Sequence, residues 1–158
     1  MHIFIKNKKL ILDKYRIKCA IGKRGIGNKK KEGDKITPKG KFRIKIILYR
    51  KDRVPYFKSK IFKLPIKRNM GWCDDPKSNK YNKLIRFPFK HGAEKLYRED
   101  NTYDIILVLN YNSNPIRKGK GSAIFIHVSR KNYKNTLGCI AVSKGDLKKI
   151  IKKINKST

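Results

Sequence analysis

The chain has 158 residues, 39% of them hydrophobic, and its 43 basic against 11 acidic residues give a formal net charge of +32. This length favours one domain, spanning residues 1–158, that buries a core without metals or disulfides. The sequence has no apolar run of about eighteen residues, which excludes a transmembrane helix. Three widely spaced cysteines do not read as a disulfide framework.

The charge predicts an anionic partner, and three kinds are open: nucleic acid, a membrane surface or an acidic wall polymer. The lysines are spread along the chain and no aromatic nucleic-acid-binding motif accompanies them, so nucleic-acid binding is the less favoured function. The first residues, MHIFIKNKKLILDKYRIKCAIGK, are interrupted by charge and lack the apolar centre of a secretory signal. Cytoplasmic residence and export by another route are both open.

The predicted elements begin with strands. Residues 2–12 and 15–23 alternate apolar and polar side chains, which is typical of half-buried strands. Asp13 and Lys14 stand between them as a two-residue turn. The pattern therefore predicts a hairpin.

The middle of the chain is mainly loops and strands. Residues 25–40 are rich in glycine and charge and predict a long loop that ends in a T-P-x-G turn. Residues 41–50 alternate as a strand, and residues 54–88 show no regular pattern. Residues 102–112 and 122–129 hold short apolar runs of the length of buried strands.

The end of the chain predicts a helix. Ser143 and Asp146 form an S-x-x-D capping signature. Apolar side chains follow at helical spacing, namely Leu147, Ile150, Ile151 and Ile154. The fold class is therefore mainly β with minor α, in which the helix is C-terminal.

One histidine and one cysteine lie close together in the sequence between these last elements. His127 ends a predicted strand, and Cys139 follows a polar loop and precedes the helix. A thiol needs a base or a lowered pKa to act as a nucleophile, and histidine is the usual base. Gly138 allows a tight turn in which amide N–H groups face a developing oxyanion. This arrangement predicts thiol-dependent acyl transfer.

Two alternatives compete with that interpretation. A lone cysteine is often a small buried apolar residue, and Cys19, in a strand pattern, is expected to be one. A zinc site needs three or four ligands, and no C-x-x-C pair or second nearby histidine accompanies His127 and Cys139. We therefore expect no metal and no other cofactor.

The same segment resembles the signature of the L,D-transpeptidase (YkuD-type) catalytic domain, a histidine, a loop and then [S/T]-H-G-C-[I/V]. Here His127 is followed by a loop and by T-L-G-C-I, with Cys139 at the cysteine position. An Asp that family members often carry seven residues after the cysteine is matched by Asp146. The blocks KKEGDKITPKGKFRI, WCDDPKSNKYN, LYREDNTYDIILVLNYN and GKGSAIFIHV also resemble the family, so the resemblance covers most of the chain.

The resemblance implies a β-sandwich-like catalytic fold with a C-terminal helix. It implies that Cys139 is the nucleophile and His127 the proton acceptor and donor, with amides around Leu137 and Gly138 as oxyanion donors. Thr136 and Tyr103 are further candidates for contact with the substrate.

The implied reaction is peptidoglycan cross-linking through a thioester with a stem-peptide donor, which is then transferred to an amine acceptor. An L,D-carboxypeptidase, a basic nucleic-acid-binding module and a non-catalytic wall-binding domain are the alternatives. The resemblance also implies inhibition by carbapenem-type β-lactams and residence in the periplasm or cell envelope.

Two residues depart from the family pattern. Leu137 stands where the family has a second histidine, and Ala141 stands where an arginine is common. If the arginine holds a substrate carboxylate, its replacement changes how a stem peptide binds. The residues therefore support the type of reaction more firmly than the geometry of substrate binding.

Overall fold

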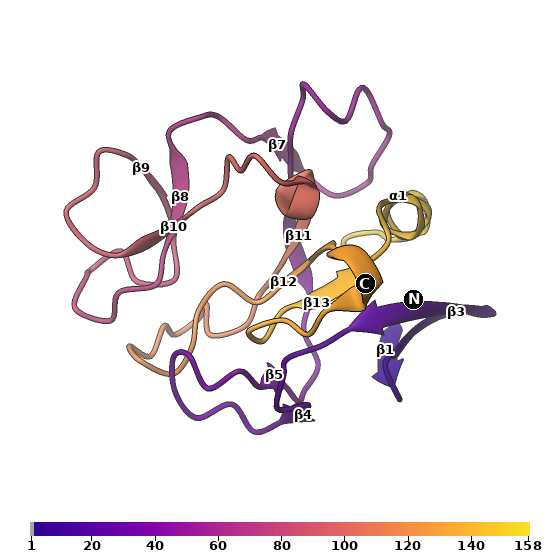
Figure 1. Ribbon diagram of the computed structural model, residues 1–158, viewed down its shortest axis with the longest axis horizontal. Coiled ribbons are helices and arrows are strands. Elements are labelled where there is room, and N and C mark those ends of the chain that lie inside the picture. Colours follow the sequence, from indigo (N-terminus) through magenta and orange to yellow (C-terminus); the bar gives the residue numbers. More distant parts are fainter. Residues whose placement is uncertain (1) are drawn as a thin grey trace.

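The computed structural model describes residues 2–158 as a β-rich chain with one α-helix (Figure 1). The helix, α1, spans Lys144–Lys153, and short 3-10 helices span Asn101–Tyr103 (η1) and Lys131–Tyr133 (η2). The strands are β1 Ile3–Lys6, β2 Lys9–Leu12, β3 Tyr15–Ala20, β4 Ile26–Gly27, β5 Thr37–Pro38, β6 Ile44–Tyr49, β7 Lys63–Pro65, β8 Met70–Cys73, β9 Leu84–Arg86, β10 Ala93–Lys95, β11 Ile105–Leu109, β12 Phe125–Val128 and β13 Ile140–Val142.

An eight-stranded mixed sheet forms the centre of the fold, in the order β1-β2-β3-β13-β12-β11-β6-β7. Its pairs are antiparallel except for β12 with β13 and β6 with β7. A three-stranded sheet, β10-β8-β9, lies at the left in Figure 1, and β4 pairs with β5 at the bottom of the same view. The mainly β class with a C-terminal helix is thus confirmed.

The prediction of one strand over residues 2–12 is wrong. Asn7 and Lys8 both have positive φ, 50° and 55°, and form a two-residue turn that divides the segment into β1 and β2. Such φ values match the twist of a tight hairpin, and asparagine tolerates them better than most residues. The predicted turn at Asp13 is confirmed, with φ 51° between β2 and β3.

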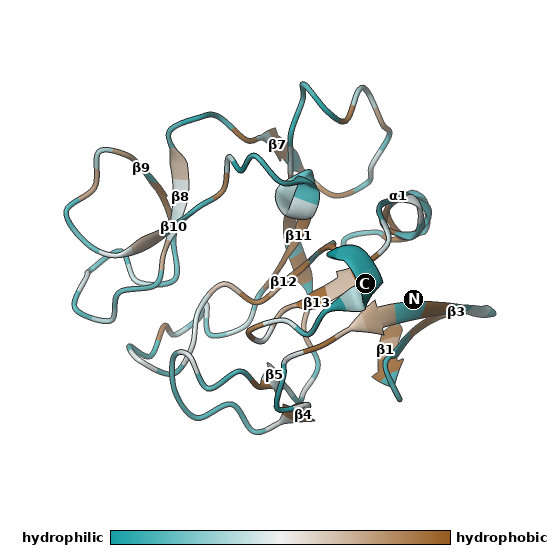
Figure 2. Ribbon diagram, viewed as in Figure 1, coloured by the Kyte–Doolittle hydropathy of each residue, from teal (hydrophilic) through white to brown (hydrophobic). Residues whose placement is uncertain are grey.

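The central strands are rich in apolar residues, which are brown in Figure 2, and two apolar clusters pack on the sheet. Because side chains alternate along a strand, Ile126 and Val128 face one core while Phe125 faces the other. Helix α1 packs on the first face through Leu147, Ile150 and Ile151. The predicted apolar stripe of the helix is therefore confirmed.

The cap of the helix also follows the prediction. The Ser143 side chain accepts a hydrogen bond from the Asp146 N–H at 3.1 Å, and its hydroxyl donates to the Asp146 carboxylate at 2.6 Å. These bonds satisfy an amide at the helix start that would otherwise lack a partner. Within residues 2–158 no helix has the length and apolar character needed to cross a membrane.

The irregular stretch 54–88 contains the short strands β7, β8 and β9, which the sequence pattern did not show. Trp72 of β8 contacts Phe125 of β12 edge to face, with ring centroids 5.3 Å apart. This contact packs the three-stranded sheet against the second core. It brings residues 70–95 close to the segment that holds His127.

Candidate active site

The central sheet brings Cys139 and His127 to the same face on neighbouring strands. β12 and β13 are parallel, with Ile126 opposite Ile140 and His127 opposite Ala141. Cys139 lies one residue before β13, so its side chain shares the face of Ala141 and His127. The pairing thus brings together two residues that a loop separates in the sequence.

The Cys139 thiol lies between two main-chain groups. The sulfhydryl donates to the Ala123 carbonyl, with sulfur and oxygen 3.1 Å apart, and the Phe125 N–H donates to the sulfur at 3.4 Å. Ala123 precedes β12, and Phe125 is the first residue of that strand. In this resting arrangement the thiol hydrogen is bound to a carbonyl oxygen.

His127 is held in one tautomer by its own strand. Its Nδ1 lies 2.9 Å from the Val128 carbonyl oxygen, and the side chain is buried, with 6% of the residue exposed. A carbonyl can only accept, so Nδ1 carries the hydrogen. In the neutral ring Nε2 is then the free acceptor, which is the atom that a general base uses.

Loss of solvation disfavours the charged form of both groups, the partly exposed Cys139 and the buried His127. Burial raises the pKa of the Cys139 thiol to about 12, and the Phe125 N–H opposes this shift. Burial lowers the pKa of His127 to about 4, against the opposing effect of the Val128 carbonyl. Near pH 7 the site therefore holds a neutral thiol and a neutral imidazole, and not a thiolate–imidazolium pair.

Tyr103, a candidate for substrate contact, lies behind the imidazole. Its ring meets the His127 ring edge to face at a centroid distance of 5.4 Å, and only 6% of the residue is exposed. Its hydroxyl donates to Glu94 at 2.6 Å. Burial raises the pKa of Tyr103 and also that of Glu94. In this position Tyr103 supports the imidazole, and its hydroxyl is already bound.

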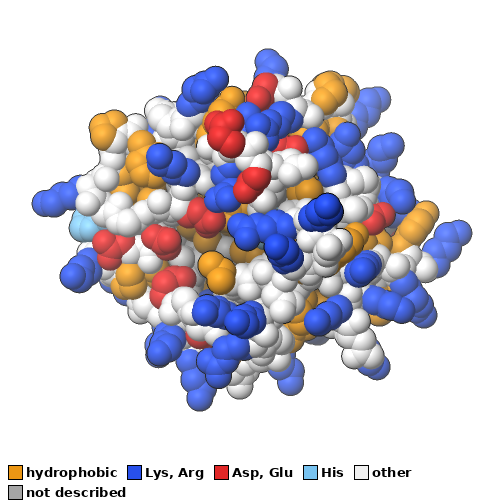
Figure 3. Space-filling model, in the orientation of Figure 1, with side chains coloured by type: hydrophobic (Ala, Val, Ile, Leu, Met, Phe, Trp, Pro, Cys, Tyr) orange, Lys and Arg blue, Asp and Glu red, His pale blue; other side chains and the backbone are white. Residues whose placement is uncertain are grey.

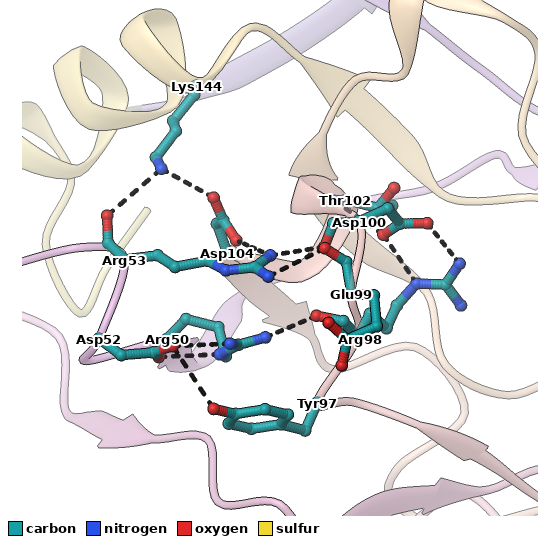
Figure 4. Close-up of polar contacts among 10 residues, drawn as sticks. All are labelled: Arg50, Asp52, Arg53, Tyr97, Arg98, Glu99, Asp100, Thr102, Asp104 and Lys144. Carbon is teal, nitrogen blue, oxygen red and sulfur yellow. Dashed lines mark hydrogen bonds and ion pairs between the residues drawn. The ribbon is translucent and has the colours of Figure 1, made fainter.

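A polar network fixes the short helix η1 that carries Tyr103 (Figure 4). Asp100 caps η1 by accepting from the Thr102 N–H at 3.1 Å. Asp104, at the other end and buried, accepts from Arg53 at 3.3 Å and from Lys144 at 2.7 Å. Since Lys144 opens α1, the network joins the helix after Cys139 to the element behind His127.

A second arm of the same network centres on Arg50. Its guanidinium donates twice to Asp52, at 2.9 and 2.7 Å, and once to the Arg98 carbonyl at 2.6 Å. It also lies over the Tyr97 ring, 3.5 Å from the centroid (Figure 4). These contacts hold the segment before η1 against the end of β6.

The turn before Cys139 depends on Gly138. Its φ is +141°, and a Cβ there would lie 3.0 Å from the Ile36 carbonyl oxygen. The Thr37 hydroxyl donates to the Gly138 carbonyl at 2.8 Å and accepts from the Gly22 N–H at 2.8 Å. Residues of the 25–40 loop therefore contact this turn directly and fix its position.

Thr136, the other candidate for substrate contact, binds within the turn. Its hydroxyl accepts from the Gly138 N–H at 3.2 Å and donates to the Cys139 carbonyl at 2.6 Å. One of the two predicted oxyanion donors, the Gly138 amide, is therefore engaged. Within residues 2–158 the amides of Leu137 and Cys139 have no backbone acceptor.

The two departures from the family pattern occupy contrasting places. Leu137 is 75% exposed directly before the Gly-Cys pair. Ala141 is 1% exposed and lies beside His127 in the sheet. At the first position a large apolar side chain faces solvent, and at the second a small one lies next to His127.

Several charged residues near the site were missed as site residues, although the block KKEGDKITPKG contains two of them, Glu32 and Asp34. Lys29 and Asp34 form an ion pair at 2.6 Å with side chains only 2% and 3% exposed. Glu32 accepts from the Tyr81 hydroxyl. Glu94, which lies outside the sequence blocks that resemble the family, binds Tyr103 as described. Only the pairing of distant strands and loops reveals these contacts.

The remaining cysteines and histidines lie elsewhere. Cys19 is buried in β3, as expected, and burial raises its pKa to about 11. Cys73 is buried, and His91 contacts Asp75 at 3.3 Å. In the described part of the chain, no three His, Cys, Asp or Glu side chains come together as metal ligands could.

Comparison with known protein families assigns the chain. The family model described as the L,D-transpeptidase catalytic domain, YkuD, matches residues 1–158, the whole chain. The chain therefore belongs to this family, whose enzymes act in peptidoglycan metabolism. The comparisons with curated proteins and with solved structures give no match.

Proposed function

We propose that the protein is a peptidoglycan L,D-transpeptidase in which Cys139 is the nucleophile and His127 the general base. The observation that carries this proposal is the placement of both side chains on one face of neighbouring strands, with His127 Nδ1 bound to the Val128 carbonyl. This bond leaves Nε2 free to take a proton. Membership of the family supplies the class of substrate.

In the first step, His127 Nε2 takes the thiol proton, and the sulfur of Cys139 attacks the carbonyl carbon of the third residue of a stem peptide. The negative charge moves to the carbonyl oxygen. Amide N–H groups of Leu137 and Cys139 are the available donors for it, and one such donor typically contributes about 2.7–4 kcal/mol to lowering the barrier.

In the second step, the C–N bond to the terminal D-residue breaks and the imidazolium gives its proton to the leaving amine. A thioester on Cys139 remains. An amine of a second stem then attacks this thioester and loses a proton to His127, and the new amide forms as the C–S bond breaks. The imidazole returns the proton to the sulfur, which restores the resting thiol.

Water in place of the amine would make the enzyme an L,D-carboxypeptidase. The two reactions differ only in the molecule that enters after the thioester. The two reactions are distinguished by incubating purified muropeptides with the protein and measuring the product masses by mass spectrometry. Cross-linking yields a dimer, and hydrolysis yields a shortened monomer. Cys139→Ala should give neither product.

Cys19→Ala is the matched control, since it removes a buried thiol from the opposite face of the same sheet. This variant should retain turnover. His127→Ala should fold and lose about 10²–10⁴-fold in acylation rate, the usual contribution of a general base. Wild-type turnover by Cys139→Ala would refute the mechanism. Inertness of the wild type, combined with salt-sensitive nucleic-acid binding, would favour the basic-module alternative.

A carbapenem gives a second test of the same acyl chemistry. A nucleophilic thiol beside oxyanion donors should open the strained lactam ring and keep the acyl group as a thioester. We expect one adduct per chain, seen as a mass increase and mapped to Cys139. An adduct on Cys73, with Cys139 unmodified, would show that Cys139 is not the nucleophile.

A further inference from the structure

A large groove lies on the face of the central sheet that is opposite to Cys139. Its volume is about 930 Å³, near the upper end of the roughly 300–1,000 Å³ usual for ligand pockets. Ile44, Ile126 and Ile140 contribute to its floor. These residues alternate with those of the active-site face, and neither His127 nor Cys139 lines the groove.

The walls of the groove are also largely apolar. β1 contributes Ile3 and Ile5, and the segment before β6 contributes Phe42. Two large apolar side chains of the lining, Phe4 and Ile26, are 61% and 42% exposed. An exposed apolar patch next to an apolar groove is uncommon in a protein that has no partner there.

All charged side chains that line the groove are positive. They are Lys6, Lys39, Lys41 and Arg43, and all four are exposed. No Asp or Glu of residues 2–158 lines it, and none of the four has a carboxylate within 4.0 Å. The ion pairs of the described residues all involve other basic side chains. A negatively charged ligand at the edge of the groove would therefore meet basic side chains that have no carboxylate partner.

We propose that this groove binds an acyl chain of an anionic phospholipid, with the headgroup phosphate held by Lys39, Lys41 and Arg43. An apolar channel with a rim of one charge is complementary to an amphiphile of the opposite charge. The protein thereby docks to an anionic membrane surface through β1 and the 37–43 segment. This inference is independent of the transpeptidase chemistry.

The overall charge makes a local test necessary. Figure 3 shows lysine and arginine side chains spread over the whole visible face, so a diffuse attraction to anionic vesicles would involve any of them. The groove instead requires particular lysines and an apolar contact. Each variant at the groove therefore needs a control variant that removes the same charge or a similar apolar side chain elsewhere on the surface.

The test is co-sedimentation of the full chain with phosphatidylcholine vesicles that contain or lack phosphatidylglycerol. Wild-type protein should bind only the anionic vesicles. Lys39→Ala combined with Lys41→Ala should weaken binding by about fivefold for each lysine. Lys148→Ala combined with Lys152→Ala removes the same charge from exposed positions on α1 and should leave binding unchanged.

The apolar contact is tested by Phe4→Ser against Phe62→Ser, which removes an aromatic ring that is 67% exposed and outside the groove lining. Only Phe4→Ser should weaken binding. Short-chain phosphatidylglycerol should compete for the protein, and the headgroup glycerophosphoglycerol alone should not. Absence of binding to the anionic vesicles, equal losses in either control, or equal competition by the headgroup would overturn the proposal.

Discussion

The buried neutral imidazole of His127 makes the stability of the protein depend on pH in a predictable direction. Burial lowers its pKa from 6.5 to about 4 in the folded chain. As the pH falls below 6.5, the unfolded chain takes up a proton that the folded chain does not. The stability due to this group is therefore complete above pH 6.5 and is lost progressively toward pH 4.

The size of the effect follows from the two pKa values. Between pH 7 and pH 5, proton uptake by the unfolded state alone should lower the free energy of unfolding by about 2 kcal/mol. Urea unfolding at the two pH values measures it. His127→Gln should remove this dependence, whatever its own stability, while His2→Gln, which changes an exposed histidine, should retain it.

The window above pH 5 separates the imidazole from the carboxylates whose pKa is lowered in the folded chain, such as Asp34. Asp34 has a pKa of about 2, lowered by Lys29 and neighbouring amides against the effect of burial, and its stabilising contribution is lost only as the pH falls below about 4. Equal losses of stability between pH 7 and pH 5 in wild type and His127→Gln would refute the claim that the ring is buried and neutral.

Three further results are expected from the contacts around the site. Asp104→Asn should lower the free energy of unfolding by about 2–3 kcal/mol, because a buried carboxylate loses its charge between two partly exposed cations. Asp52→Asn changes a side chain that is 50% exposed, and it should lower the free energy of unfolding clearly less in the same urea titration. Ser143→Ala should cost about 1 kcal/mol through loss of the helix cap, with activity per folded molecule preserved; a loss of activity without a change in melting would contradict this structural role. Alkylation of Cys139 by iodoacetamide in the absence of substrate should rise about tenfold per pH unit from pH 7 to 9, since its pKa is about 12, and a plateau near neutral pH would show a preformed thiolate.

Patterns within a few residues of sequence predicted the parts of the fold that depend on interactions between residues close together in the chain. The capping pair and the apolar spacing of α1 act within a few residues, so Ser143 and Leu147 could be placed without the structure. The long strands β6 and β11 were predicted for the same reason, since their apolar content reflects burial. The hairpin β1-β2 was missed because Asn7-Lys8 contains no glycine, and its turn is recognised only from φ.

The environment of the site could not be predicted in the same way. The pKa values of Cys139 and His127 depend on what covers them, which is set by the strand pairing and by distant loops. The place of Tyr103 behind the imidazole likewise depends on a network that joins segments far apart in the chain. The sequence spacing predicted a thiol beside a base. It could not predict how far burial shifts the pKa of Cys139 or of His127.

The neutral resting state has a consequence for how reaction begins. Because burial raises the pKa of the Cys139 thiol and lowers the pKa of His127, moving a proton from the thiol to the imidazole is unfavourable in the free protein. The thiol hydrogen is also bound to the Ala123 carbonyl and must leave it to reach His127. A substrate carbonyl beside the sulfur changes this balance, because the charge then passes to an oxyanion that amides stabilise and does not remain on sulfur. Proton transfer and carbon–sulfur bond formation should therefore be coupled, and the thiol should be less reactive toward simple alkylating agents than toward its acyl donor.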